Sequence, residues 1–143
     1  MGRIKFDTEL IRSVSRIQEI TRVPVRDCID LEGQFLVIVE EGKAAKAIGK
    51  KGANVRRLEN DFNRKIKIIE FNPEPSQFIR NLVAPQKVND VVIDGEVMTL
   101  TPADTKTRGQ LIGRSGSNLR TLESIIKRYF PIKEIKVARD HNG

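Results

Sequence analysis

The chain has 143 residues, of which 38% are hydrophobic and 31% charged, a composition typical of a folded soluble protein and not of a disordered segment. Its single cysteine, Cys28, excludes an intramolecular disulfide and a cysteine-rich zinc site, and it favours a reducing cytoplasm. The N-terminal MGRIKFDTEL lacks the apolar core of a signal peptide, and no apolar run approaches membrane-spanning length. We therefore expect a cytoplasmic protein with no membrane partner.

The first half of the chain predicts, in order, a helix, a hairpin, two helices and a strand. Apolar residues at helical spacing and alternating β-rich runs give these elements, and glycines or prolines separate most of them. The expected bounds are 8–21 for the first helix, 25–31 and 35–41 for the hairpin, 43–48 and 52–63 for the next helices, and 65–71 for the strand.

The segment Asn72-Pro73-Glu74-Pro75 predicts a boundary, because two prolines in four residues end a strand and stiffen a connection. The second half then repeats the order of elements. Its expected bounds are 76–83, 88–93, 96–101, 104–112, 118–129 and 132–138. We therefore expect two small domains, residues 1–73 and 74–143, each with a thin core.

A stretch of twelve residues occurs twice. Residues 48–59 read IGKKGANVRRLE and residues 112–123 read IGRSGSNLRTLE, with seven of the twelve positions identical at an offset of 64. The shared frame is I-G-[KR]-x-G-[AS]-N-[VL]-R-x-L-E. An internal repeat of this kind marks a repeated structural unit, so the frame is the natural place to look for function.

The positive charge is concentrated around the two copies. Residues 43–67 hold nine Lys and Arg against two acidic residues, and residues 106–139 hold the same numbers. Each stretch carries a net charge of +7, which equals the net charge of the whole chain, so the remainder is acidic. This distribution is typical of a protein that binds a polyanion.

The paired glycines of the first copy enclose a turn, residues 49–52, which is called the first turn below. We expect Gly49 to adopt a left-handed conformation at the end of a helix, and Gly52 to allow another backbone to approach closely. Lys50 and Lys51 then project outward. A phosphate there would meet backbone N–H groups, the positive end of a helix dipole and two ammonium groups. No GKS or GKT follows Gly52, which excludes a nucleotide-binding P-loop.

The second turn, residues 113–116, places Arg114 and Ser115 between Gly113 and Gly116. It offers one charge and one hydroxyl group where the first turn offers two charges. We therefore expect the first turn to bind phosphate more strongly.

The residues that flank each turn have two interpretations. The apolar positions could line a groove for bases or belong to the core, the asparagines could contact a base or cap a helix, and the arginines could contact phosphate or pair with Glu59 and Glu123 one helical turn later. These residues are Ile48, Asn54, Val55 and Arg56 in the first copy, and Ile112, Asn118, Leu119 and Arg120 in the second.

The doubled IGxxG, each between two helices and preceded by a hairpin, resembles tandem K homology (KH) domains. The order of elements is similar to the type II arrangement, and the close repeat and the IGKKGANVRRLE motif resemble the NusA family of transcription factors in its compact archaeal form. The resemblance implies an α+β fold with two three-stranded sheets packed by helices. It also implies binding of single-stranded RNA in transcription termination or antitermination, with each GxxG turn gripping the RNA backbone.

Bacterial NusA proteins carry a polymerase-binding domain and an OB-type barrel ahead of the KH pair, whereas this chain starts directly with the first KH helix. RNA polymerase is therefore a partner that the resemblance implies, with no segment of this chain to assign to it. We expect a monomer, a state in which two packed domains could remain.

An enzyme is a rival class of function. The only histidine, His141, lies in a polar tail, and Cys28 falls in an apolar strand pattern. Acidic pairs such as Asp30 with Glu32 and Asp94 with Glu96 flank hairpin turns, where acidic residues are common. We expect no catalytic site, no metal and no cofactor.

A second alternative is a KH-type ribosomal or ribosome-biogenesis protein that binds or assembles on RNA, because the same turns would serve it. Single-stranded DNA is a further alternative ligand, since it also presents phosphates and bases.

Overall fold

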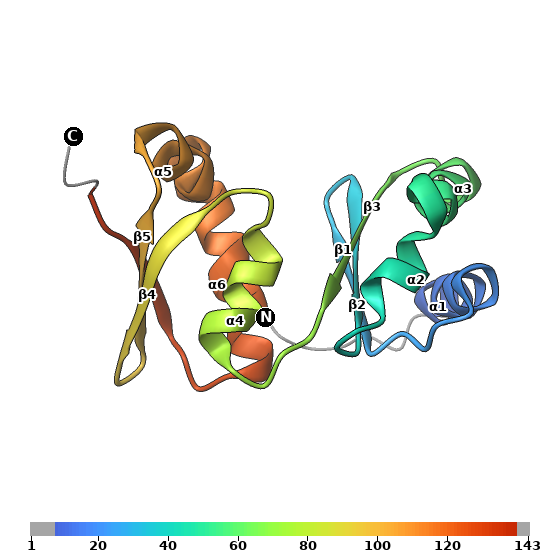
Figure 1. Cartoon of the computed structure of the whole chain (residues 1–143), viewed down its shortest axis with the longest axis horizontal. Helices are drawn as coiled ribbons and strands as arrows, with labels where there is room; N and C mark the ends of the chain where they lie inside the picture. Colours follow the sequence, from blue (N-terminus) through green and yellow to red (C-terminus); the bar gives the residue numbers. More distant parts are fainter. Residues whose placement is uncertain (1–7, 140–143) are drawn as a thin grey trace. The chain divides into compact units, whose positions relative to one another are not determined.

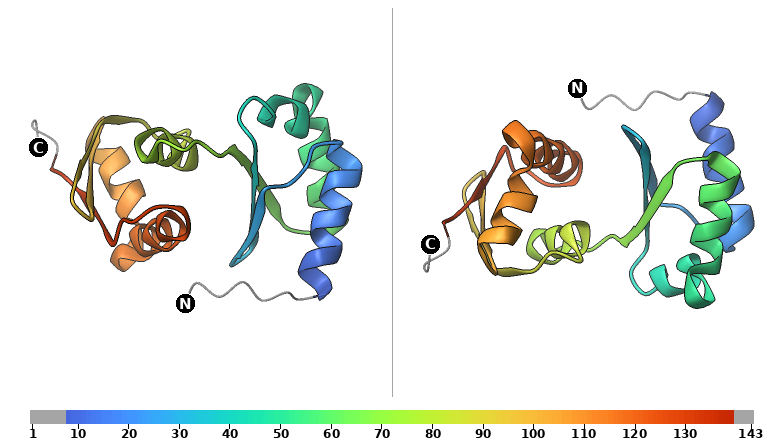
Figure 2. Two further views of the ribbon diagram at one scale, coloured as in Figure 1. Left: turned by 90° about the horizontal axis from the view of Figure 1, so that it is seen from below. Right: turned by 90° about the horizontal axis from the view of Figure 1, so that it is seen from above.

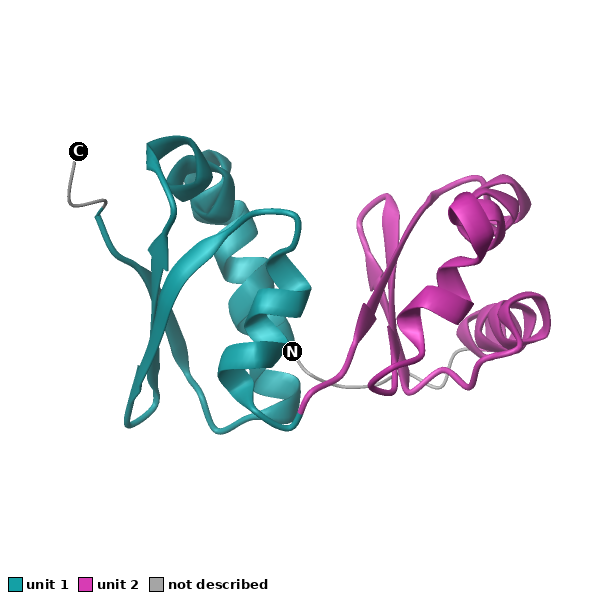
Figure 3. Cartoon of the chain, viewed as in Figure 1, with its two compact units in different colours: residues 1–2, 73–143 teal, residues 3–72 magenta. Residues whose placement is uncertain are grey.

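The computed structural model of the protein describes residues 8–139. The chain forms two compact units, and the division between them falls between Asn72 and Pro73 (Figure 3). Each unit contains one three-stranded sheet with helices (Figure 1). The mixed fold with two small sheets that the resemblance implied is therefore confirmed.

The first unit follows the predicted order, and its helices and strands lie within a few residues of the expected bounds. They are α1 Thr8–Thr21, β1 Asp27–Leu31, β2 Gln34–Val39, α2 Ala44–Ile48, a single 3₁₀ turn η1 Lys50–Gly52, α3 Ala53–Phe62 and β3 Lys65–Glu70.

The second unit repeats the order of the first. Its elements are α4 Pro75–Val83, β4 Val88–Asp94, β5 Val97–Pro102, α5 Thr105–Ile112, η2 Arg114–Gly116, α6 Ser117–Tyr129 and β6 Glu134–Val137. Pro75 occupies the first turn of α4, where a missing N–H costs no helical hydrogen bond. Asp104 caps α5 by accepting a hydrogen bond from Thr107 N at 2.7 Å.

The two sheets share one topology. The central strand pairs antiparallel with the strand before it and parallel with the last strand, giving the orders β1-β2-β3 and β4-β5-β6. Parallel neighbours need a crossover connection, and in both units this crossover holds a helix, a glycine turn and a second helix. The turns are thus fixed at both ends by elements that pack on the sheet.

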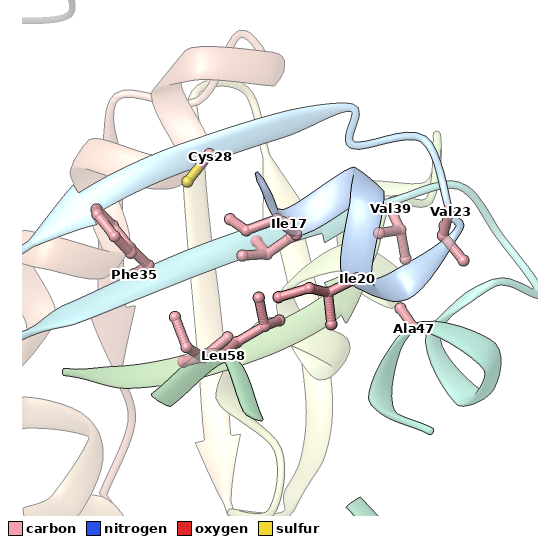
Figure 4. Packing of buried hydrophobic residues seen from close by; sticks show 10 residues of the cluster. Ile17, Ile20, Val23, Cys28, Phe35, Val39, Ala47 and Leu58 are labelled. Carbon is pink, nitrogen blue, oxygen red and sulfur yellow. The ribbon is translucent and has the colours of Figure 1, made fainter. Parts of the chain in front are cut away.

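In each unit the helices cover one face of the sheet (Figures 1 and 2). The first core joins Ile17 and Ile20 of α1, Leu58 of α3 and alternate residues of β2 such as Phe35 and Val39 (Figure 4). Burying a side chain of this size contributes about 1.5–3 kcal/mol, so these contacts hold α3 at a fixed position on the sheet.

The second core is built from equivalent elements. Phe78 of α4 and Ile126 of α6 are fully buried, as are Met98 and Leu100 of β5. The Phe78 ring also meets the Tyr129 ring edge-on, with centroids 5.4 Å apart. The helix that follows the second turn is therefore anchored in a buried core, like its counterpart in the first unit.

Candidate nucleic-acid interface

The first turn connects two helices that pack on the sheet. Gly49 N donates to Ala45 O at 3.0 Å and so ends α2, and Gly52 N donates to Gly49 O at 3.0 Å and closes the turn. Gly52 is then the N-cap residue of α3, whose amide groups point back toward the turn. The residues between the glycines are presented at the positive end of a helix of ten residues.

Both glycines have a positive φ, but the left-handed conformation and the close approach occur at the other glycine than predicted. Gly49 has a φ of 83° with a ψ of 165°, an extended conformation essentially restricted to glycine, whereas Gly52 is the left-handed residue, with φ 74° and ψ 19°. Close approach also occurs at Gly49, where an added Cβ would lie 2.9 Å from Asn54 N. At Gly52 the nearest atom to such a Cβ would be Arg56 Nη1, at 3.4 Å.

The second turn has nearly the same backbone. Gly113 has φ 73° and ψ 176°, and Gly116 has φ 76° and ψ 12°. Ser115 and Lys51 share the same angles, φ 55° and ψ 28°, although neither is a glycine. The repeat in sequence is therefore a repeat of backbone conformation, including its least favourable residue.

The four residues enclosed by the glycines are exposed, as expected. They are Lys50, Lys51, Arg114 and Ser115. Three of these carry a positive charge on a long side chain, and the fourth carries a hydroxyl group. All are therefore accessible to a ligand from solvent.

The asparagines, each the second residue of its helix, do not cap that helix. Asn54 Nδ2 donates to Lys46 O at 3.3 Å, and Asn118 Nδ2 donates to Gln110 O and Leu111 O, each at 3.0 Å. These acceptors are carbonyl groups at the end of the preceding helix, which lack helical partners. Each asparagine thus ties the helix after the turn to the helix before it.

The arginines bond to the turn and not to the glutamates. Arg56 Nη1 donates to Lys51 O, and Arg120 Nη1 donates to Ser115 O at 2.8 Å. Glu59 accepts instead from Ile66 N at 3.1 Å, and Glu123 accepts from Ile135 N at 2.9 Å. The pairing at i+3, one of the two interpretations of these arginines, is therefore replaced by bonds that fix the turn on one side and the last strand on the other.

The four apolar positions beside the turns are half-buried. Ile48 and Ile112 end the helix before each turn, and Val55 and Leu119 lie in the first turn of the next helix. Val55 packs against the first core. Their exposed portions leave them available to a ligand beside the glycine turn.

Two basic residues of the positively charged stretch 43–67 are partly buried, so they contribute less to the basic surface than the sequence predicted. Arg64 Nη2 donates to Leu31 O at 2.7 Å and to Gln34 O at 3.2 Å, its guanidinium pairs with Asp30, and it lies 3.8 Å from the centroid of the Phe35 ring. It therefore holds the β1–β2 hairpin. Lys67 is partly buried, and desolvation lowers the pKa of its ammonium group.

Two basic residues near the first turn were not singled out by the sequence pattern. Lys46 on α2 and Arg57 on α3 are both exposed, and they flank the turn on either side. Their counterparts in the second unit, Gln110 and Thr121, are uncharged. The only sequence signal for them is the run of positive charge over residues 43–67.

Three of the residues considered for catalysis are buried or ion-paired within the fold. Cys28 is buried, and burial raises the pKa of its thiol to about 12, which keeps it protonated and unreactive. Asp30 pairs with Arg64, and Glu96 pairs with Lys133 at 3.3 Å. His141 lies outside the described residues.

Within residues 8–139, no three His, Cys, Asp or Glu side chains gather as metal ligands. No helix in this range is long and apolar enough to cross a bilayer.

Comparison with known proteins places this geometry in a family. The model of the KH domain family matches residues 34–98, from β2 through the first turn and into β5. A probable transcription termination protein NusA of Methanocaldococcus jannaschii is 34% identical over 140 residues, which cover 96% of this chain and 76% of that protein. This chain belongs to the NusA family of KH proteins. The family resemblance seen in the sequence is thereby confirmed.

Further comparisons agree with the NusA assignment. The protein of the same name from Methanococcus vannielii is 32% identical, over 95% of this chain and 80% of that protein. A solved structure, the crystal structure of APE1850, superposes with a TM-score of 0.74 at 22% identity, covering 93% of this chain and all of that one. This last similarity extends over both units and concerns the fold alone.

Proposed function

We propose that this NusA-family protein binds single-stranded RNA through its two glycine turns and acts in transcription termination or antitermination. The observation that carries the proposal is that one turn conformation, with φ and ψ nearly equal at its first, third and fourth positions, occurs twice and exposes basic side chains both times. The role in transcription termination is supported by the relatives, which are named as probable transcription termination proteins. Each turn belongs to its own KH domain, residues 1–73 and residues 74–143.

The turn binds the phosphate backbone in this proposal. Lys50 and Lys51 contribute two charges at the N-terminal end of α3, where the helix dipole attracts anions. Gly49 and Gly52 adopt the positive-φ conformations of the turn, which presents Lys50 and Lys51 to the sugar–phosphate chain. In the second domain Gly113, Arg114, Ser115 and Gly116 have the same role.

The half-buried apolar residues form the base-contacting side of the site. Ile48 with Val55, and Ile112 with Leu119, offer apolar surface beside the turn, and bases can lie on it while the phosphates contact the turn. Asn54, Arg56, Asn118 and Arg120 complete the site. The asparagine amides are already bonded to the preceding helix, so their part is to hold the site in shape.

The first domain makes the stronger contact with the RNA backbone. Lys46, Lys51 and Arg57 correspond to Gln110, Ser115 and Thr121 in the second domain. Each of these basic residues adds an attraction to phosphate that depends on salt, and an uncharged residue does not. The second turn and these flanking positions therefore contribute less electrostatic attraction to the phosphate backbone.

In this proposal the protein works as a monomeric, non-enzymatic binding factor with RNA polymerase as its partner in transcription. The names of the relatives support the role in transcription.

The test is a titration of the full chain with a short single-stranded RNA at several salt concentrations. Lys50→Asp with Lys51→Asp should weaken binding by about tenfold or more and lower the dependence of affinity on salt, because phosphate contacts are lost. The matched control is Arg12→Asp with Lys65→Asp, which makes the same change of charge at exposed positions of the same unit, away from the turn.

The control should bind nearly as well as the parent. Equal weakening by both pairs would show that only overall charge matters, and no weakening by either would remove the first turn from the site. Parallel titrations with single-stranded DNA of the same sequence test whether ribose is recognised.

A further inference from the structure

Each turn is bonded by an arginine five residues further along the chain. Arg56 Nη1 donates to Lys51 O, and Arg120 Nη1 donates to Ser115 O at 2.8 Å. The acceptor is a main-chain carbonyl in both cases, so the bond does not depend on which side chain stands at the accepting position. This agrees with the repeat frame, where the arginine is shared and the accepting residue differs.

The accepting residue has an unfavourable backbone conformation. Lys51 and Ser115 both have a φ of 55° and a ψ of 28°, the left-handed region. An L residue is disfavoured there by roughly fivefold to thirtyfold relative to its ordinary conformations. Neither lysine nor serine is among the residues that tolerate this region, so another interaction must hold it.

The hydrogen bond from the arginine is strong enough, and suitably placed, to hold the left-handed conformation. A hydrogen bond from a charged donor favours the bonded state by roughly tenfold or more. The guanidinium also lies across the adjoining glycine: a Cβ added to Gly52 would come within 3.4 Å of Arg56 Nη1, and one added to Gly116 within 3.2 Å of Arg120 Nη1. Each arginine therefore covers the left-handed pair of residues and bonds to the first of them.

We infer that Arg56 and Arg120 are positioning residues, which hold Lys51 and Ser115 in the left-handed conformation and thereby set the direction in which the turn presents its outward side chains and amides. The inference rests on the proposed function for its consequence in RNA binding. The conformational part concerns the free protein and stands without RNA.

The first test measures the free protein. The Gly52 amide donates to Gly49 O across the turn, so its rate of hydrogen exchange with water, measured by NMR, reports whether the turn is closed. Arg56→Met should raise this rate by about fivefold to tenfold, because one bond that closes the turn is lost. Arg57→Met is the matched control: it removes the same charge from the adjacent exposed position and should change the rate by less than about twofold.

The second test is a double-mutant cycle in the second turn. Ser115→Gly changes no charge and removes the cost of the left-handed conformation, since glycine adopts it freely. In the background that keeps Ser115, Arg120→Met should weaken RNA binding and speed hydrogen exchange of the Gly116 amide. In the Ser115→Gly background the same change should have a clearly smaller effect on both, which is the coupling expected of two residues that act on one conformation.

Faster exchange in Arg56→Met and Arg120→Met with rescue by Ser115→Gly supports the inference. Unchanged exchange in the free protein overturns it, whether or not RNA binding is weakened. Weaker RNA binding with unchanged exchange would assign the arginines to direct phosphate contact and leave the proposed function standing. If the parent does not bind RNA, the proposed function fails, while the exchange measurements still decide the positioning role.

Discussion

Gly113 and Asn118 are so close that a Cβ added to the glycine would lie 2.7 Å from the Cβ of the asparagine and 2.9 Å from its backbone nitrogen. The same relationship holds between Gly49 and Asn54, at 2.9 Å from the backbone nitrogen. The first glycine of each turn is therefore required by the contact between two helices, in addition to its positive φ. The asparagine completes that contact by donating to carbonyl groups in the last turn of the preceding helix.

Replacing Gly113 by alanine should destabilise the second unit by about 2–4 kcal/mol, because both the contact with Asn118 and the backbone angle are unfavourable for a Cβ. Urea denaturation measures this. Gly109→Ala is the control, since Gly109 lies in α5 with no atom within 4 Å of an added Cβ. That change should be neutral or stabilising by about 0.5–1 kcal/mol. Equal effects of the two substitutions would contradict the role assigned to Gly113.

Exchanging the third residue between the turns should exchange their electrostatic strength. Lys51→Ser gives the first turn the pattern of the second, and Ser115→Lys does the reverse, at positions with the same backbone angles. The salt dependence of RNA binding should fall by about 0.7 in log–log slope for the first change and rise by about the same for the second.

Because each exchange replaces a non-glycine residue by another, the backbone cost of the left-handed conformation is similar in both variants. The opposite signs of the two effects are therefore the diagnostic result. A shift of the same sign in both would show that the residues between the glycines do not contact phosphate.

The glutamate that ends each repeat should matter for stability and not for RNA. Glu59 accepts from Ile66 N at 3.1 Å, and Ile66 is buried at the start of β3. Glu59→Ala leaves that N–H without its partner and should cost about 1–3 kcal/mol, measured by denaturation. Glu59→Gln keeps a carbonyl acceptor and should cost much less. RNA affinity of either variant, measured well below its unfolding temperature, should match the parent; a selective loss of affinity in Glu59→Gln would place the glutamate in the site.

Much of the fold could be predicted because the sequence states it twice. Periodicity and the repeat predict the order of elements, the β-hairpin of each unit and the outward exposure of Lys50 and Lys51. Which glycine makes the close contact and which is left-handed could not be predicted. Both are glycines in the same motif, and only the packing of α3 against α2 distinguishes Gly49 from Gly52. Sequence alone therefore placed the contact at the wrong glycine.

Side-chain bonds to backbone groups were also beyond the sequence. The partners of Asn54 and Arg56 are carbonyl oxygens, eight and five residues earlier, which no residue pattern marks. Arg64 counted toward the basic surface by its charge, yet it binds the β1–β2 hairpin. Charge counting overestimates a binding surface wherever a cation is used inside the fold.

The most direct test of the central claim is to locate the RNA on the protein. Backbone amide shifts of the full chain, followed by NMR during titration with a short single-stranded RNA, should change most over residues 48–56 and residues 112–120, and should saturate at a lower RNA concentration in the first group. Changes concentrated elsewhere, for example on the strands of the two sheets with both turns unaffected, would contradict the account.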